Sequence, residues 1–112
     1  MSKGRFLAEF ELYVMLALAR LGHDAYGVSI RKEIEVRTGR PVSIGAVYAT
    51  LGRLDDKGYV DHAISDPLPI PGGRARKYFA LTQRGRLALA HSTTMLVHMM
   101  EGVDLKVKVE PR

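Results

Sequence analysis

The residues of this sequence best suited to chemistry are basic, and they gather in one stretch. Between Pro67 and Met100 the charged side chains are five positive and none negative: Arg74, Arg76, Lys77, Arg84 and Arg86. The whole chain has 17 Lys and Arg against 12 Asp and Glu, so this stretch accounts for its net charge of +5. Positive charge concentrated in this way is typical of proteins that bind polyanions, nucleic acid above all. A solvated loop is the alternative that charge alone leaves open.

Four histidines raise the question of a metal centre: His23, His62, His91 and His98. His91 and His98 would share one face of a helix but stand about 10.5 Å apart along its axis, at about 1.5 Å per residue. Two ligands of one ion cannot be that far apart within a chain, so we expect no metal unless a symmetric dimer brings two copies together. The sequence has no phosphate-binding glycine loop, paired carboxylates or nucleophile elbow, so we expect neither a cofactor nor an enzyme.

The composition is that of a single-domain protein of the cytoplasm. The chain has 112 residues, 46% of them hydrophobic and 26% charged, and it lacks cysteine, which excludes disulfides and thiolate chemistry. Glu9, Glu11 and Arg20 interrupt the first apolar stretch, which argues against a membrane helix. No signal-peptide cleavage site follows the basic start. We expect one domain over residues 1–101 and a tail over residues 102–112.

Three helices are expected in the first half of the chain. Apolar spacing predicts the first over residues 6–21 and a second that is capped by Asp24 and ends at Gly39. Ser43 caps a third, which Gly58 ends. The predicted core face of the third helix consists of Ile44, Val47, Tyr48, Leu51 and Leu54. Its predicted outward face is small at the start and positive toward the end, and consists of Ala46, Ala49, Thr50, Arg53 and Lys57.

The second half of the chain predicts a hairpin followed by one long helix. β-favouring residues predict antiparallel strands over residues 59–65 and 76–81, joined by a loop rich in proline and glycine. Thr82 caps a last helix over residues 83–101. The first and last helices are apolar on more than one face, which predicts a homodimer that buries Phe6, Phe10, Leu89, Leu96, Met99 and Met100. Residues 103–109 alternate as a strand would, without an obvious partner.

This order of elements predicts a winged helix-turn-helix, a mainly α fold with a small β-hairpin wing (α+β). In that fold the third helix enters the major groove of double-stranded DNA and the wing follows the phosphates. The predicted DNA-binding residues are Ser43, Ala46, Tyr48, Ala49, Thr50, Arg53, Lys57, Arg74, Arg76 and Lys77. Two of these assignments have an alternative. Tyr48 could be purely structural. Arg53 and Lys57 could be solvated charges that Asp55 and Asp56 offset.

Four short signatures in this order and spacing resemble the PadR family of transcriptional regulators. They are Ala25-Tyr26-Gly27-Val28, Ser43 to Leu51 with Arg53-Leu54, Lys57-Gly58-Tyr59-Val60, and Gly72 to Thr82 followed by Gly85 and Leu87. The resemblance extends from Leu7 to Ala90. It implies a bacterial or archaeal homodimeric repressor that pairs through its first and last helices, in the subfamily with a single C-terminal helix.

The chain departs from the pattern of the family at three points. Ala49 stands where the family often has proline, and Gly52 stands where it often has a charged or polar residue, so base readout differs. Ligand-binding members stack flat effectors on a tryptophan that this chain lacks, so no effector site carries over. We expect a sequence-specific repressor of a pseudo-palindromic operator. The alternative is a winged helix that binds proteins, which the basic stretch argues against.

Overall fold

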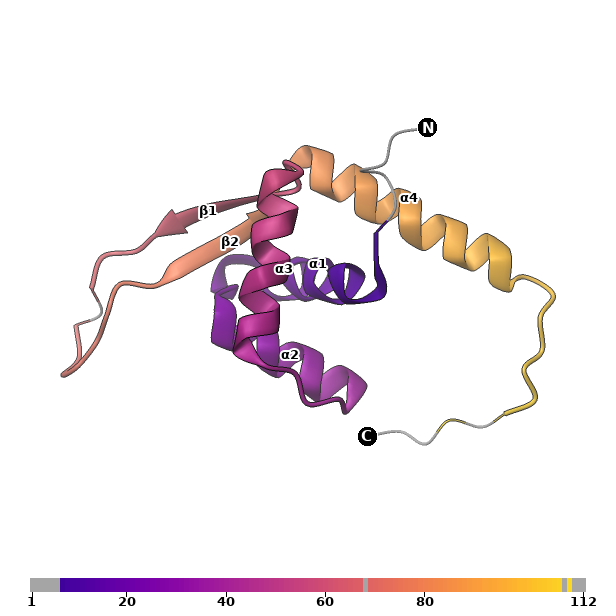
Figure 1. Ribbon diagram of the computed structural model, residues 1–112, viewed down its shortest axis with the longest axis horizontal. Coiled ribbons are helices and arrows are strands. Elements are labelled where there is room, and N and C mark those ends of the chain that lie inside the picture. The colour runs from indigo at the N-terminus through magenta and orange to yellow at the C-terminus, as the bar shows by residue number, and fades with distance from the viewer. Residues whose placement is uncertain (1–6, 68, 108, 110–112) are drawn as a thin grey trace.

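The helix α1 (Glu9–Leu21) is the element around which the others pack. The computed structural model describes residues 7–67, 69–107 and 109. After α1 these contain a 3-10 turn η2 (Gly22–Asp24), α2 (Gly27–Thr38), α3 (Ile44–Asp56), β1 (Val60–Ile64), β2 (Lys77–Leu81) and α4 (Gln83–Met100) (Figure 1). The predicted winged helix-turn-helix, with α-helices and a small antiparallel hairpin, is therefore confirmed.

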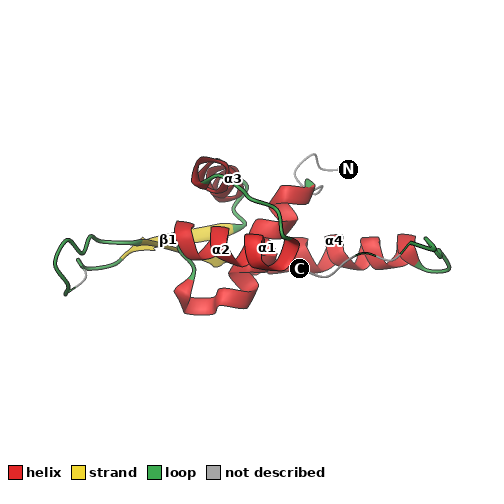
Figure 2. Cartoon of the chain, turned by 90° about the horizontal axis from the view of Figure 1, so that it is seen from below, coloured by secondary structure: helices red, strands yellow, loops and turns green. Residues whose placement is uncertain are grey.

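The molecule is elongated because two elements project from its helical body. The hairpin extends from one end and the C-terminal half of α4 from the other (Figures 1 and 2). The radius of gyration is 15.8 Å, against about 13 Å for a compact chain of this length. The core lies between these projections and draws side chains from every helix and both strands, among them Val14, Met15, Leu18, Ile30, Ile34, Val47, Leu51, Leu54, Val60, Phe79 and Leu89.

The second helix begins later than its sequence predicts, so the assignment of Asp24 as its cap is wrong. Residues 22–24 form the 3-10 turn, and the cap position falls on Tyr26, whose N–H donates to Ser29 Oγ at 2.9 Å. The cause lies far along the chain. The amide of Phe79 in β2 donates to the Ala25 carbonyl at 2.8 Å, which keeps Ala25 extended and postpones the helix.

The buried face of α3 is rotated relative to the predicted one. Val47, Leu51 and Leu54 are buried as predicted, but Ile44 and Tyr48 are 37% and 46% exposed. Thr50, which the sequence placed on the outward face, is 1% exposed, so that placement is wrong. Its hydroxyl tolerates burial because it accepts a hydrogen bond from Arg53 Nη2 at 2.9 Å. The face packed against the core is thus the stripe at positions 47, 50, 51 and 54.

The hairpin has the predicted antiparallel register, with strands slightly shorter than expected. Val60 pairs with Leu81 and Ile64 pairs with Lys77. Beyond the last pair, the amide of Ser65 donates to the Arg76 carbonyl at 2.8 Å. We call β1, β2 and the loop between them the wing.

The start of α4 is capped as the sequence predicts, by Thr82. Its hydroxyl accepts from the Gly85 amide at 2.9 Å and donates to the Gly58 carbonyl at 2.7 Å, which ties α4 to the end of α3. Leu89, predicted at a dimer interface, is instead 8% exposed in the core of its own chain, because the first turns of α4 pack on α1 and β2. Phe6 lies outside the described residues. The described residues of the tail form no strand.

At Gly85 the backbone of α4 lies close to the turn after α3. A Cβ at this position would overlap the carbonyl group of Tyr59. By contrast, a Cβ at Gly52, on the open side of α3, would meet nothing within 4 Å. Both glycines lie in helices, so the two positions form a matched pair.

We predict opposite effects on stability for alanine at these two glycines. Gly85→Ala should lower the free energy of unfolding by about 1 to 3 kcal/mol, because α4 must move away from Tyr59. Gly52→Ala should raise it by up to about 1 kcal/mol, because alanine favours an exposed helix position. Urea denaturation measures both, and a neutral Gly85→Ala would contradict this account of how α4 is seated.

Candidate nucleic-acid interface

The outward face of α3 carries almost no side chain over its first turns. α3 stands out on one side of the molecule (Figure 2). The exposed residues at its centre are Gly45, Ala46, Ala49 and Gly52, and the larger exposed side chains Ile44 and Tyr48 lie to one side of them. Ser43 Oγ accepts from the Ala46 amide at 3.0 Å and fixes the start of the helix as predicted. Gly52 belongs to this face, the position at which departure from the family pattern predicted a difference in base readout. A helix face of this kind allows another molecule to approach the backbone closely.

Tyr48 lies where α3 meets the start of α2. Its ring packs against Gly27 so closely that a Cβ at Gly27 would overlap it. The side chain is nevertheless 46% exposed, so Tyr48 is not the buried core residue that the apolar spacing predicts. Its position borders the outward face of α3.

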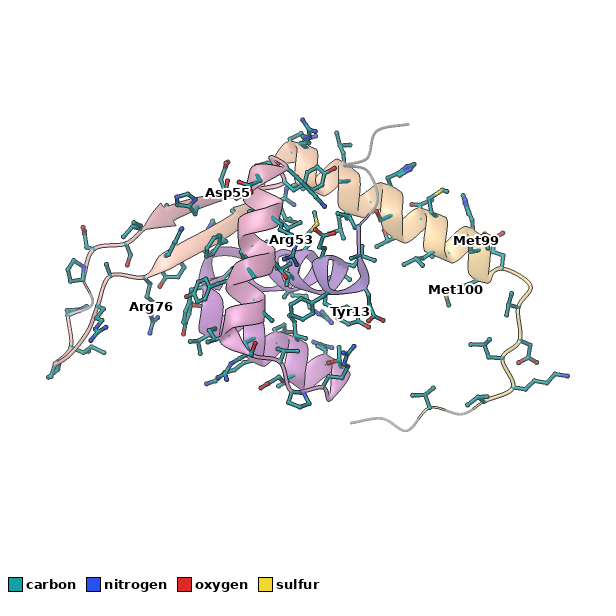
Figure 3. The ribbon with its side chains drawn as sticks, viewed as in Figure 1. Tyr13, Arg53, Asp55, Arg76, Met99 and Met100 are labelled. Atoms are coloured by element: carbon teal, nitrogen blue, oxygen red, sulfur yellow. The ribbon has the colours of Figure 1, made fainter. Side chains whose placement is uncertain are left out.

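Two cations at the C-terminal end of α3, Arg53 within the helix and Lys57 at its cap, meet a carboxylate that comes from α1. We call them the cations of α3. Glu11 Oε2 accepts from Lys57 Nζ at 2.9 Å and lies 4.0 Å from Arg53 Nε. Arg53 extends from α3 over α1 in Figure 3. Its side chain is 57% exposed, whereas that of Lys57 is 28% exposed and directed toward α1. Asp55 pairs instead with His62 of β1 at 3.1 Å. Among the described residues no ion pair joins Asp55 or Asp56 to these cations.

The Glu11 carboxylate is charged although it is buried. Burial by itself raises its pKa, but the hydrogen bond from Lys57, the hydrogen bond from the Ala8 amide and the charges of Lys57 and Arg53 together outweigh that effect. The pKa of Glu11 therefore lies below its ordinary value of 4.5. Sequence spacing offers no signal for this contact, because Glu11 and Lys57 are 46 positions apart.

The three cations of the wing differ in exposure: Arg76 is partly buried against an aromatic ring, whereas Arg74 and Lys77 are exposed. The Arg76 guanidinium lies 4.3 Å from the centre of the Tyr26 ring, and that ring meets Tyr78 edge-on at 5.6 Å. Lys77 lies over the Phe79 ring at 5.6 Å and remains exposed. Arg74 lies in the loop and is exposed. The sequence predicted all three cations as phosphate contacts, and the structure brings them to one wing, with Arg76 immediately before the start of β2 (Figure 3).

Other kinds of site find little support in the described part of the chain. No three histidine, aspartate or glutamate side chains there lie close enough to hold a metal ion. None of the helices described is both long and apolar enough to cross a membrane. The exposed helix face and the basic wing are the features that point to a ligand.

The fold and this surface define a winged-helix DNA-binding protein. The profile of the transcriptional regulator PadR-like family matches residues 15–91. The chain belongs to that family, as the four signatures indicated, and it is a DNA-binding transcriptional regulator.

Several solved structures share this fold. A PadR-family regulator from Eggerthella lenta is 26% identical, with a TM-score of 0.63, 83% of this chain and 82% of that chain covered. One from Clostridium difficile is 23% identical, with a TM-score of 0.68 and coverages of 83% and 95%. The RosR protein of H. salinarum is 22% identical, with a TM-score of 0.68 and coverages of 91% and 84%. A search of curated proteins found no significant match.

The Glu11 ion pair predicts an acid-dependent loss of stability. Because the folded-state pKa of Glu11 is lowered, its stabilisation is present above pH 4.5 and is lost as the pH falls through that lowered pKa. Glu11→Gln should reduce the free energy of unfolding at pH 7 by about 1 to 2 kcal/mol.

The difference in the free energy of unfolding between Glu11→Gln and the unmodified protein should shrink as the pH falls below 4.5. Urea denaturation across that pH range measures it. Glu9→Gln is the control, since its pair with Arg40 is solvent-exposed and should matter by less than about 1 kcal/mol. A difference independent of pH would contradict the assignment.

Proposed function

We propose that the protein is a cytoplasmic homodimeric repressor that binds a pseudo-palindromic operator. The observation that carries the proposal is the outward face of α3, bare over its first turns and followed by the half-exposed Arg53. The proposed base-reading surface is this face, with Ser43 and Tyr48 at its border. The proposed phosphate contacts are Arg74, Arg76 and Lys77 of the wing. Thr50 is left out because it is buried, and Lys57 because it is paired.

Mapping the genomic sites bound by the protein, followed by binding to operator and scrambled duplexes at fixed salt, tests this function directly. A regulator of this kind binds its operator about 10³-fold or more tightly than other DNA. Equal binding to both duplexes, or binding to neither, would favour the alternative of a protein-interaction module.

Close approach of DNA to α3 predicts a second consequence of Gly52→Ala. The variant is expected to be more stable yet to bind its operator more weakly, because the added methyl group stands between the helix and the bases. A steric cost of about 1 to 3 kcal/mol corresponds to a roughly 5- to 150-fold loss of affinity. Fluorescence anisotropy with the operator measures it. Unchanged affinity would show that the duplex does not contact α3 closely at Gly52.

Wing contacts to phosphate predict a change in salt dependence. Each contact contributes about 0.9 to the slope of log affinity against log salt. Arg74→Ala should flatten the slope by about 0.9 and weaken binding to all duplexes alike. Lys106→Ala removes the same charge from the tail, far from the wing in Figure 1, and should leave the slope unchanged. Equal slopes in the two variants would refute the wing contact.

The exposed end of α4 supports the proposed dimer. Leu96, Met99 and Met100 are 49%, 77% and 65% exposed, on the part of α4 that extends beyond the body (Figures 1 and 3). A continuous apolar surface of this kind is unusual on a soluble monomer and marks a contact with another chain. Methionines suit such a contact because their side chains adapt to the partner surface. Phe10 of α1 is half-buried and is the proposed contribution of that helix.

Charge at this surface should separate the two chains. Leu96→Asp with Met99→Asp is expected to give monomers by light scattering and at least a tenfold loss of operator affinity, because one chain then binds one half-site. Val36→Asp places one such charge at an exposed apolar position of α2 and should leave the dimer intact. An unmodified protein that is monomeric at micromolar concentration yet binds a palindrome tightly would refute the dimer.

A further inference from the structure

We propose that Glu11 is a positioning residue for DNA recognition, which retains Lys57 within the protein and presents Arg53 to the duplex. This inference rests on the proposed function, since it takes the outward face of α3 as the DNA-binding surface. It assigns a role in specificity to α1, a helix outside the proposed base-reading surface and the wing.

Glu11 is a fixed negative charge beneath α3. Its Oε1 accepts from the Ala8 amide at 2.9 Å, which closes the first turn of α1. Its Oε2 accepts from Lys57 Nζ at 2.9 Å. The side chain is 6% exposed, so the carboxylate cannot turn toward solvent without breaking both contacts. Its charge therefore acts on α3 from a constant position.

The two cations of α3 respond unequally to this charge. Lys57 donates directly to Glu11, and its departure would leave a buried carboxylate without that partner, which is costly. Arg53 is only 4.0 Å from the same oxygen and donates from Nη2 to Thr50 Oγ1. These two contacts orient the guanidinium, whose fork of five N–H donors retains donors for a base edge or phosphate. Arg53 is therefore available to the duplex, whereas Lys57 is held within the protein by Glu11.

The arrangement should favour specific over nonspecific binding. Nonspecific affinity depends on the number of cations free to meet phosphates, whereas base readout depends on the geometry of the side chains that reach the groove. Glu11 pairs with Lys57 and so removes it from the cations free to meet phosphates. The same carboxylate restrains Arg53 in the position from which it can reach a base edge. Loss of its charge should therefore strengthen binding to any DNA and blur the preference for the operator.

The test is Glu11→Gln, which keeps an oxygen for the Ala8 amide and removes the charge. Anisotropy titrations with operator and scrambled duplexes over a range of salt give affinities and slopes. We expect the scrambled duplex to bind about three- to tenfold more tightly, with a slope steeper by about 0.9, and the specificity ratio to fall about threefold or more.

Glu33→Gln is the matched control, because Glu33 also pairs with two arginines, Arg20 at 3.5 Å and Arg37 at 3.0 Å. It adds the same charge to the protein without freeing a cation of α3, so slope and ratio should not change. In a background of Arg53→Ala and Lys57→Ala, Glu11→Gln should have no effect on either quantity. Equal behaviour of the two glutamine variants, or an effect that persists in this background, overturns the inference.

A measurement on the unmodified protein remains decisive if Glu11→Gln does not fold. Side-chain NMR should show the Lys57 ammonium signal unchanged when operator is added, and the Arg53 Nε–H signal shifted. A Lys57 signal that moves as far as that of Arg53 overturns the inference. Unmodified protein without preference for operator DNA would instead overturn the proposed function, so the two failures are distinct.

Discussion

The packing of α3 on α1 is the contact on which the rest of the structure depends. Val47, Leu51 and Leu54 are buried along one side of α3, and Val14 and Leu18 lie in the same core cluster. Because this side immobilises the helix, its opposite side is a rigid ridge of glycine and alanine held toward solvent. One helix thus serves the core and the candidate interface at once. Substitutions on the exposed side should accordingly affect binding without disturbing the core.

The wing is joined to the helix-turn-helix by more than chain connectivity. The Phe79 amide bonds to the Ala25 carbonyl, and Tyr78 forms a β-bridge with Tyr26. The Arg76 guanidinium lies on the same Tyr26 ring. These contacts couple β2 to the residues immediately before α2, so the wing and α2 are oriented together. The cation immediately before β2 therefore contributes to that orientation as well as to local positive charge.

Electrostatics in this protein depends on partners that are distant along the chain. The basic surplus falls in one stretch, yet the cations of α3 meet a carboxylate of α1. Asp55, a sequence neighbour of these cations, pairs with His62 of the wing instead. Net charge is therefore a good guide to the class of ligand, and a poor guide to which cation is available to it. Availability depends on burial and pairing.

The sequence by itself determined the features that form between residues close together in the chain. The caps at Ser43 and Thr82, the hairpin and the family signatures are local patterns, and all were correct, because a cap or a turn is formed within a few residues. Tertiary structure decided the start of α2, the burial of Thr50 and Leu89, and the pairing of Lys57. The physical reason is that backbone pairing, helix rotation and ion pairing there join residues distant in sequence. Local periodicity carries no information about such contacts.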